Sequence, residues 1–401
     1  MIPKSILLIM PYGSVGGMER LALNFYTFYK KQGYTVKGLK FIKLDSDIIN
    51  FNEDELFFKT QDFLSMSSLE RYTFYLKLPF LLRTVIIKQK ATHTIAFGDM
   101  ANLFSSLTYT KEIKIGSIHA LKSVELKNKT FFNSLTRFGY TTTYRNLTKL
   151  VCISKAIKKD LQEECGYQFS NLEVIYNPHD IKNITNLAKE PIKSKQEVEI
   201  FTQPTILFLG RLTVQKAPWH LIKAFSLIHK VNNNINLVII GDGDKKVTLY
   251  IKNLITELNL ETNVHLLGRR SNPYKYIAAT NILALSSNYE GTPNVIVESI
   301  AIGTPIVSSF CTKGIMELMS VKQKPESDEN IITESGIITP NFFEGKLEIP
   351  ADNIITDKEK KFSKALSIVL NDKFYNENLN TFKSGLLSKF DMKTVANKYL
   401  S

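Results

Sequence analysis

The sequence predicts an α/β protein made of two doubly wound domains, each built around a parallel sheet. The chain has 401 residues, which is long for a single domain. Short apolar segments of strand length alternate with helical patterns along most of it. A polar and charged stretch without apolar periodicity, residues 186–203, interrupts this alternation and indicates a linker.

The first half contains short apolar segments that we expect to be buried strands. They are SILLIM (5–10), YTVKGLKFI (34–42), HTIAFG (93–98), IKIGSIH (113–119), KLVCIS (149–154) and LEVIYNP (172–178). Continuous apolar strands separated by helices are typical of a parallel sheet covered on both faces. We therefore expect an N-terminal domain over residues 1–185.

The alternation resumes after the linker and predicts a C-terminal domain over residues 204–380. Its expected strands are PTILFLG (204–210), NLVIIGDG (236–243), NVHLLG (263–268), NILALSS (281–287), TPIVSS (304–309) and SGIITP (335–340). Ligands of such folds bind outside the carboxyl ends of the strands, so we expect the site in the cleft between the two domains. Residues 381–401 end the chain, and Val395–Leu400 has a helical pattern.

Composition indicates a globular cytoplasmic protein. Three scattered cysteines, Cys152, Cys165 and Cys311, form no CxxC or Cys/His pair, which fits reduced thiols. No apolar run approaches the length of a membrane span. The segment SILLIM is too short for the core of a signal peptide and leads into a glycine loop.

Positive charge is concentrated in one block. The net charge is +13, and residues 101–150 carry 8 Lys and Arg against 2 acidic residues. Within this block, KNKTFFNSLTRFGYTTTYRNLTK (127–149) mixes aromatic with basic side chains. That mixture suits an anionic membrane surface, and nucleic acid is a second candidate. A solvated helix face with a few core aromatics explains it equally well.

The stretch NYEGTPNVIVESIAIGTPIVSS (288–309) places two glutamates eight positions apart. Thr292 is the expected N-cap of a short helix, with Pro293 at its first position and Gly303 as its C-terminal stop. Glu290 then lies in a loop, and Glu298 lies on an apolar, buried helix. A buried carboxylate costs several kcal/mol unless it is hydrogen-bonded. Its donors come either from the fold itself or from ligand hydroxyls.

The stretch LGRLTVQKAPWHLIKAF (209–225) places Arg211 and Lys216 around a strand-to-helix loop. Two cations at the mouth of a parallel sheet can neutralise a diphosphate, although two surface cations would give the same pattern. The glycines Gly13, Gly16 and Gly17 follow the first strand, where backbone amides can approach a phosphate, although a plain tight turn would explain them equally well. Their GxxGG spacing differs from GxGxxG and disfavours a dinucleotide site.

His119 ends an apolar strand, where it either bonds to substrate or is a satisfied core histidine. The Asp45–Asp47 stretch superficially matches an Asp-x-Asp metal site, but we expect a turn there. No cluster has convincing metal-ligand spacing, so we expect no metal and no cofactor.

Four segments in this order resemble the retaining glycosyltransferases of the GT-B fold in glycosyltransferase family 4, the glycosyl transferases group 1. They are GRLTVQK, GDG, LGRRSNPYKY and YEGTPNVIVESIAIGTPIV. The spacing of Glu290 and Glu298, followed by Gly303, is the most specific element. The resemblance extends to GGMER (16–20) and to VCIS…VIYNPHD (151–180). It implies two Rossmann-like domains with an inter-domain cleft, and a C-terminal helix that crosses back onto the N-terminal domain.

The resemblance also implies roles for individual residues. Glu298 looks like the glutamate that binds the nucleotide ribose, which would make ligand hydroxyls its donors, and Glu290 looks like the one that faces the donor sugar. The resemblance gives the remaining positions as the diphosphate clamp (Arg211, Lys216), the N-terminal phosphate loop (Gly16, Gly17), the base contact (Arg269), the sugar-side histidine (His119), and backbone contacts to the sugar from Gly291, Thr292, Pro293 and Asn294.

The implied function is a metal-independent, retaining hexosyltransferase. It would move a hexose or N-acetylhexosamine from a nucleotide-diphosphate sugar, expected to be UDP-linked, to a lipid-linked or growing surface glycan such as capsule, O-antigen or lipopolysaccharide. We expect it on the cytoplasmic face of the inner membrane, in peripheral contact with anionic lipid through residues 111–149, and without a nucleic-acid partner. A transferase with a non-lipid acceptor and a catalytically silent GT-B scaffold are the alternatives.

Overall fold

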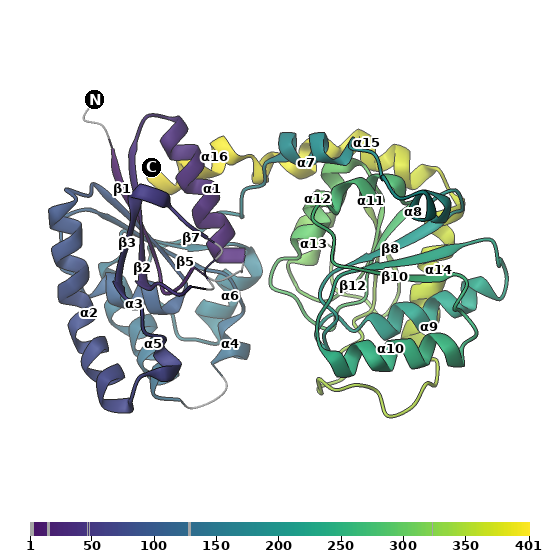
Figure 1. Cartoon of the computed structure of the whole chain (residues 1–401), viewed down its shortest axis with the longest axis horizontal. Coiled ribbons are helices and arrows are strands. Elements are labelled where there is room, and N and C mark those ends of the chain that lie inside the picture. The colour runs from purple at the N-terminus through teal and green to yellow at the C-terminus, as the bar shows by residue number, and fades with distance from the viewer. Residues whose placement is uncertain (1–3, 14–16, 46, 48, 127–129, 323) are drawn as a thin grey trace. The chain divides into compact units, whose positions relative to one another are not determined.

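The computed structural model describes residues 4–13, 17–45, 47, 49–126, 130–322 and 324–401. They form two compact units, Met1–Pro178 with Met392–Ser401, and His179–Asp391. Each unit is an α/β domain with a central, mainly parallel sheet (Figure 1). The predicted fold class of two Rossmann-like domains is therefore confirmed.

The first unit has the strand order β3-β2-β1-β4-β5-β6-β7, and neighbouring strands run parallel. The strands are β1 (Ser5–Met10), β2 (Thr35–Ile42), β3 (Glu55–Lys59), β4 (His93–Phe97), β5 (Ile113–Ile118), β6 (Lys149–Cys152) and β7 (Leu172–Val174). Sequence analysis missed β3. This edge strand is only partly buried, and charged residues at both ends leave it a run of just three apolar residues, 56–58.

Helices cover both faces of this sheet, and the alternation of side chains along β1 explains how. Ile6 and Leu8 point to one face and pack with α1 and α16, whereas Leu7 and Ile9 point to the other and pack with α2 and α3. The helices are α1 (Gly17–Lys31), α2 (Ser68–Lys88), α3 (Asp99–Ser106), α4 (Lys122–Glu125), α5 (Phe131–Thr141), α6 (Lys155–Glu163) and α16 (Met392–Leu400).

The last helix, α16, belongs to the first unit although α15 (Phe374–Leu387), which precedes it, belongs to the second. The Tyr29 hydroxyl donates to the Ala396 carbonyl at 2.8 Å, and the Phe25 and Tyr399 rings lie 4.7 Å apart. Buried aromatic contacts of this kind fix the end of the chain onto α1.

The second unit has the strand order β10-β9-β8-β11-β12-β14-β13, in which only the pairing of β13 with β14 is antiparallel among the described residues. The strands are β8 (Thr205–Leu209), β9 (Asn236–Ile240), β10 (Val264–Gly268), β11 (Ile282–Leu285), β12 (Ile306–Ser309), β13 (Ile331–Thr333) and β14 (Gly336–Thr339). The order reverses at β8, which has β9 on one side and β11 on the other.

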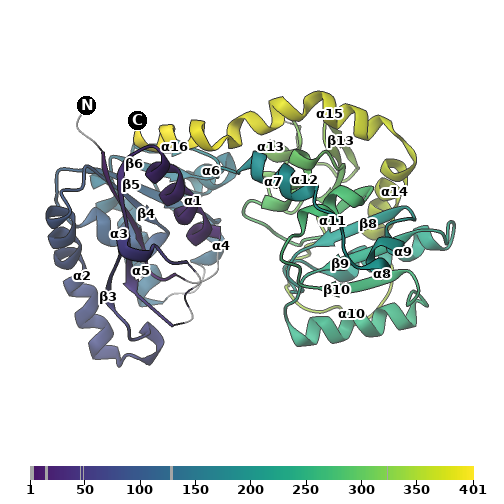
Figure 2. The same ribbon diagram turned by 45° about the horizontal axis from the view of Figure 1, so that its top comes forward.

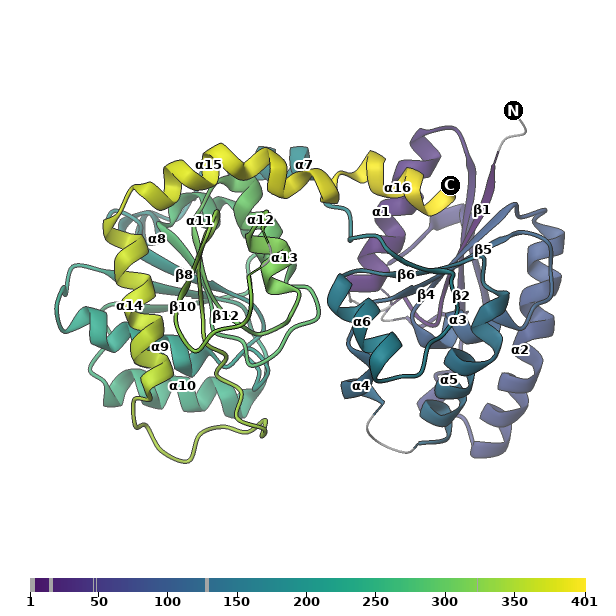
Figure 3. The ribbon, with the colours of Figure 1, turned by 180° about the vertical axis from the view of Figure 1, so that it is seen from behind.

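Helices cover both faces of the second sheet as well (Figures 2 and 3). One face carries α9 (Pro218–His229), α10 (Lys245–Glu257) and α14 (Asp357–Asn371), and the other carries α7 (Ile181–Ala188), α11 (Tyr274–Ala279), α12 (Asn294–Ile302) and α15. The remaining helices are α8 (Lys195–Ile200) and α13 (Ile315–Met319).

The segment 186–203, which was expected to be a linker, is part of the second unit and contains α8. The Ser194 side chain caps this helix by accepting a hydrogen bond from the Glu197 amide. At its other end, the Asn236 side chain donates to the Ile200 carbonyl at 2.8 Å. A polar segment can therefore be folded without apolar periodicity, because a cap and long-range hydrogen bonds hold it.

Candidate functional site

The strand order places the candidate site of the second unit at the carboxyl ends of β8 and β11. In doubly wound sheets ligands bind where the strand order reverses, because the loops diverge there and leave a crevice. Here the loop after β8 carries Arg211 and Lys216, and the loop after β11 carries Glu290. The structure thus brings three of the predicted site residues to one switch point.

Hydrogen bonds join these two loops into one surface. The Asn288 amide donates to the Gln215 carbonyl at 2.8 Å, and its side chain donates to the Val214 carbonyl at 2.9 Å. In the opposite direction, the Gln215 side chain donates to the Tyr289 carbonyl at 3.1 Å. Because each loop satisfies polar groups of the other, the side chains between them are preorganised.

Lys216 and Glu290 form an ion pair between the two loops, from Nζ to Oε1. The Ser287 hydroxyl donates to the same carboxylate oxygen at 2.7 Å. The side chains are only 15% and 8% exposed, so water screens the pair weakly. The two residues were predicted as separate ligand contacts, and their pairing was missed. Opposite charges after adjacent strands were the available signal, but strand adjacency was not known from the sequence.

The GDG turn shapes the loop that carries Arg211. The Leu212 amide donates to the Asp242 carbonyl at 2.9 Å, and the Gly210 amide donates to the Ile240 carbonyl at 3.0 Å. A Cβ atom on Gly241 would lie 1.9 Å from the Gly210 carbonyl oxygen, so this approach requires glycine. The Arg211 side chain is exposed, and it forms no hydrogen bond or ion pair with the described residues.

Helix α12 presents an N-terminus without a side-chain cap at the same edge. The predicted N-cap, Thr292, is wrong: Pro293 holds the N-cap position with extended backbone angles, and the helix begins at Asn294. The Thr292 Oγ1 atom is buried without a partner among the described residues. An open helix N-terminus favours an anion, because its backbone N–H groups have no intrahelical acceptor. Gly303 ends the helix in the left-handed conformation, as predicted.

Glu298 lies on α12 among buried apolar neighbours, but it is itself only partly buried. The expectation of a fully buried carboxylate is thus wrong, because the short helix leaves this position near the surface. The Tyr274 hydroxyl donates to Glu298 Oε1 at 3.4 Å. Sequence analysis missed Tyr274, and part of the hydrogen bonding expected from a ligand is supplied by the fold. Arg269 is exposed directly after β10, at the same edge of the sheet.

The remaining predicted site residues belong to the first unit. Gly17 begins α1, and Gly16 lies outside the described residues. His119 follows β5 at its carboxyl end, with Nε2 2.9 Å from the Ser117 hydroxyl. Burial lowers the pKa of His119 to about 3, and the nearby positive charge of Lys122 adds to the effect. The imidazole is therefore neutral at pH 7 and able to accept or donate one hydrogen bond.

The basic-aromatic block is mostly part of the core. Tyr140 and Tyr144 are fully buried, and the Lys149 ammonium donates to the Lys398 carbonyl at 2.7 Å. Among the described residues 130–149, only Phe131 and Phe138 are exposed aromatics. The expected peripheral contact with anionic lipid through residues 111–149 stays a prediction, and within 130–149 Phe131 and Phe138 are the aromatic side chains left to make it.

Asp45 lies in a turn, as predicted, and Ser46 lies outside the described residues. The Asp47 amide donates to the Leu44 carbonyl at 3.0 Å, and its carboxylate pairs with the buried Lys40 at 2.9 Å. The described part of the chain contains no group of three or more metal-ligating side chains.

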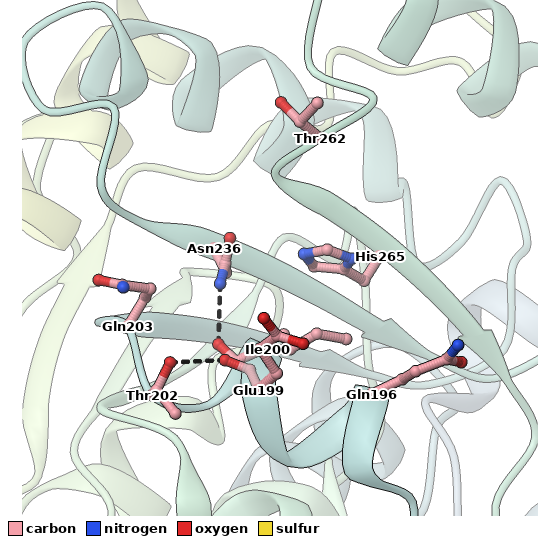
Figure 4. A pocket seen from close by; sticks show the side chains of 8 residues that line it. All are labelled: Gln196, Glu199, Ile200, Thr202, Gln203, Asn236, Thr262 and His265. Atoms are coloured by element: carbon pink, nitrogen blue, oxygen red, sulfur yellow. Dashed lines mark hydrogen bonds between the residues drawn. The ribbon is translucent and has the colours of Figure 1, made fainter.

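A separate hollow of about 520 Å³ lies at the other edge of the second sheet, at the amino ends of β8, β9 and β10 (Figure 4). Polar side chains line most of it: Gln196, Glu199, Thr202, Gln203, Asn236, Thr262 and His265. The Asn236 side-chain amide points to the Ile200 carbonyl, to which it donates a hydrogen bond (Figure 4). This hollow is distinct from the switch-point residues, which follow the carboxyl ends of the strands.

Residues 190–327 match the family Glycosyl transferases group 1. The matched region includes the switch-point residues of the second unit. The chain is 29% identical over 197 residues to an uncharacterized glycosyltransferase of Methanocaldococcus jannaschii. This match covers 49% of the present chain and 48% of that protein. It is 32% identical over 257 residues to an N-acetylgalactosaminyltransferase of Campylobacter jejuni that acts on a diphospho-undecaprenol substrate, covering 61% and 65% of the two chains.

Solved structures match the whole chain. The Anabaena protein HepE in complex with UDP superposes with a TM-score of 0.71 at 19% identity, and the match covers 99% of this chain and 98% of that one. This likeness shows that the two Rossmann-like units form a GT-B fold. In the described residues, no helix combines the length and low charge needed to cross a bilayer.

Proposed function

We propose that this protein is a glycosyltransferase that moves a hexose or N-acetylhexosamine from a nucleotide-diphosphate sugar to a lipid-linked or growing surface glycan. The observation that carries the proposal is the preorganised pair of Lys216 and Glu290 at the switch point. It supplies a cation for a phosphate and a carboxylate for a sugar within one interlocked pair of loops. Such a fixed arrangement of opposite charges is suited to a reaction in which charge moves from sugar to leaving phosphate.

Relatives of known specificity support the choice of acceptor and donor. The Campylobacter jejuni relative is named for transfer of N-acetylgalactosamine to a diphospho-undecaprenol glycan, and a Salmonella typhimurium relative is a lipopolysaccharide 1,6-galactosyltransferase. The Anabaena HepE structure contains UDP. We therefore propose UDP as the nucleotide and work at the cytoplasmic face of the inner membrane, in peripheral contact with it.

The proposed chemistry uses side chains rather than a metal. Arg211 and Lys216 would neutralise the departing diphosphate, and the open N-terminus of α12 would add backbone donors through Gly291, Thr292 and Asn294. Glu298 and Tyr274 would bind the ribose hydroxyls, and Arg269 would pack against the base. We further propose that the sugar keeps its anomeric configuration, with the leaving phosphate taking the proton of the attacking hydroxyl on the same face.

Calorimetric titration with UDP, GDP and ADP in EDTA tests the donor site. We expect selective binding of UDP without metal, weakened about tenfold or more in Glu298→Ala by loss of a charged hydrogen bond. Glu261→Ala, at an exposed position of the same unit, is the matched control and should bind like wild type. Binding of no nucleotide would favour a silent scaffold.

Transfer from UDP-sugars to a polyprenyl-diphosphate glycan and to water-soluble glycans then tests the acceptor. The proposal expects product only with the lipid-linked acceptor. Product with the soluble acceptors alone would establish a transferase but refute the lipid-linked substrate.

A further inference from the structure

Helix α2 is apolar on the side that faces solvent as well as on the side that faces the sheet. Its buried side chains, Phe74, Leu78, Leu82 and Ile86, pack in the core of the first unit. A second set stands between 49% and 73% exposed: Leu69, Tyr72, Leu76, Phe80 and Ile87. Steps of three, four, four and seven residues put this second set on one stripe of the helix. A surface helix normally turns polar side chains outward.

Helix α5 extends the apolar stripe. Phe131 and Phe138, 63% and 53% exposed, are seven residues apart and therefore lie on one side of α5. Helices α2 and α5 are neighbours (Figures 1 and 3). The ring of Phe131 lies 6.3 Å from that of Tyr72, which joins the exposed side chains of the two helices. We call the surface made by these seven side chains the α2–α5 face. An exposed apolar surface that spans two helices marks an interaction site rather than scattered surface residues.

The charges on these two helices are almost all positive. Helix α2 carries Arg71, Lys77, Arg83 and Lys88, and α5 carries Arg137. The one acidic side chain on the two helices, Glu70, is held in a capping box with Ser67 at the start of α2. The guanidinium groups of Arg71, Arg83 and Arg137 donate hydrogen bonds to backbone carbonyls. The exposed ammonium groups of Lys77 and Lys88 therefore remain as the charges that can contact a partner beside the apolar stripe.

We propose that the α2–α5 face docks the protein on an anionic lipid surface. Leucine and aromatic side chains would enter the boundary between headgroups and acyl chains, while the lysines at the flank contact lipid phosphates. A second copy of this chain fits the face less well, because a symmetric contact would bring the same positive side chains together. The inference deepens the proposed function, since a lipid-linked acceptor lies at such a surface, but binding to lipid does not depend on catalysis.

Co-sedimentation with vesicles tests the proposal on the full chain. We expect binding to phosphatidylcholine vesicles that contain phosphatidylglycerol, weaker binding to phosphatidylcholine alone, and a decrease with salt because surface charges are screened. Leu76→Ser combined with Phe80→Ser should weaken the partition about tenfold or more, as expected for loss of two large apolar side chains. Lys77→Gln combined with Lys88→Gln should reduce the preference for phosphatidylglycerol.

The matched control is Leu249→Ser combined with Ile354→Ser, two exposed apolar positions in the other unit. This control should bind vesicles like wild type, and urea denaturation should show that both apolar variants remain folded. Equal vesicle binding by the Leu76/Phe80 variant and wild type would overturn the proposal, and so would absence of any preference for anionic vesicles. A wild-type dimer in light scattering that the Leu76/Phe80 variant dissociates would assign the face to self-association instead. Vesicle binding without nucleotide binding would refute the transferase but leave the docking face standing.

Discussion

Lys216 and Glu290 meet across the switch point of the second sheet, where they join the loops that follow β8 and β11. A phosphate bound at Lys216 therefore has to share this ammonium group with a carboxylate that is already present. Binding of the phosphate would weaken the ion pair between Lys216 and Glu290. The Glu290 carboxylate would then be available to a neighbouring sugar. The pair links the two loops, and under the proposed function it is also the site for a phosphorylated sugar.

Replacing Glu290 by Gln should separate catalysis from nucleotide binding. The amide keeps an acceptor for Ser287 but removes the negative charge near the reacting centre. We expect the kcat of sugar transfer to fall about 100-fold, as for loss of one preorganised electrostatic contact. UDP affinity should stay the same or increase, since Lys216 loses its competing partner; steady-state kinetics and titration measure the two effects.

Lys216→Met is the contrasting variant. It removes the phosphate contact and should weaken UDP binding about tenfold or more. If Glu290→Gln weakened UDP binding as strongly as Lys216→Met, Glu290 would act through the shape of the loops rather than on the sugar.

Tyr274→Phe tests whether this hydroxyl positions Glu298. The Tyr274 hydroxyl donates to Glu298 Oε1 at 3.4 Å, which is a long and therefore modest hydrogen bond. We expect a roughly two- to tenfold loss of UDP affinity, corresponding to about 0.5–1.5 kcal/mol. Titration with UDP and with 2′-deoxy-UDP checks this: if the pair binds the ribose, the variant should discriminate less between them, and unchanged discrimination would place the ribose elsewhere.

Two glycine substitutions separate backbone strain from steric clash. Gly241 has φ +145 and no room for a side chain, because a Cβ atom would lie 1.9 Å from the Gly210 carbonyl. Gly268 has φ +67 and open space around it. Gly268→Ala should cost about 1 kcal/mol of unfolding free energy for its left-handed backbone, and Gly241→Ala about 3 kcal/mol or more because a clash is added. Chemical denaturation measures both, and equal losses would contradict the close approach of the loops after β8 and β9.

The stability of the protein should fall in mild acid, and His179 should contribute to that fall. Burial lowers the pKa of His179 to about 4, and its Nε2 atom is buried without a partner among the described residues. The unfolded state takes up a proton near pH 6.5, whereas the folded state takes it up only near pH 4. The contribution of neutral His179 to the free energy of unfolding is therefore complete above pH 6.5. It is lost as the pH falls towards 4, at about 1.4 kcal/mol per pH unit.

His179→Gln should flatten the pH dependence of unfolding by urea over this interval, because glutamine does not titrate. The comparison is made between pH 7 and pH 4, with each variant referred to its own value at pH 7. An unchanged slope would show that His179 has the same pKa in the folded and unfolded protein, which would contradict its burial as a neutral side chain.

The sequence by itself determined the local features of this protein. Apolar runs located most of the strands, Gly303 located the end of α12, and motif spacing placed Arg211, Lys216 and Glu290 in loops directly after strands. These features depend on a few neighbouring residues, whose backbone preferences and burial can be read from the chain. The edge strand β3 was missed because charged residues flank its three apolar residues, and helix α8 was missed because its segment has no apolar periodicity.

The tertiary structure decided which of these local features meet. Strand order is not encoded in any single segment, so only the fold showed that the loops after β8 and β11 are neighbours and that Lys216 pairs with Glu290. Only the fold likewise distinguished the two apolar sides of α2, because a helix that is apolar on two opposite sides gives no one-sided periodic signal. Its burial shows which side faces the sheet. Long-range contacts, which depend on packing of the whole domain, thus assembled the candidate site and left the α2–α5 face exposed.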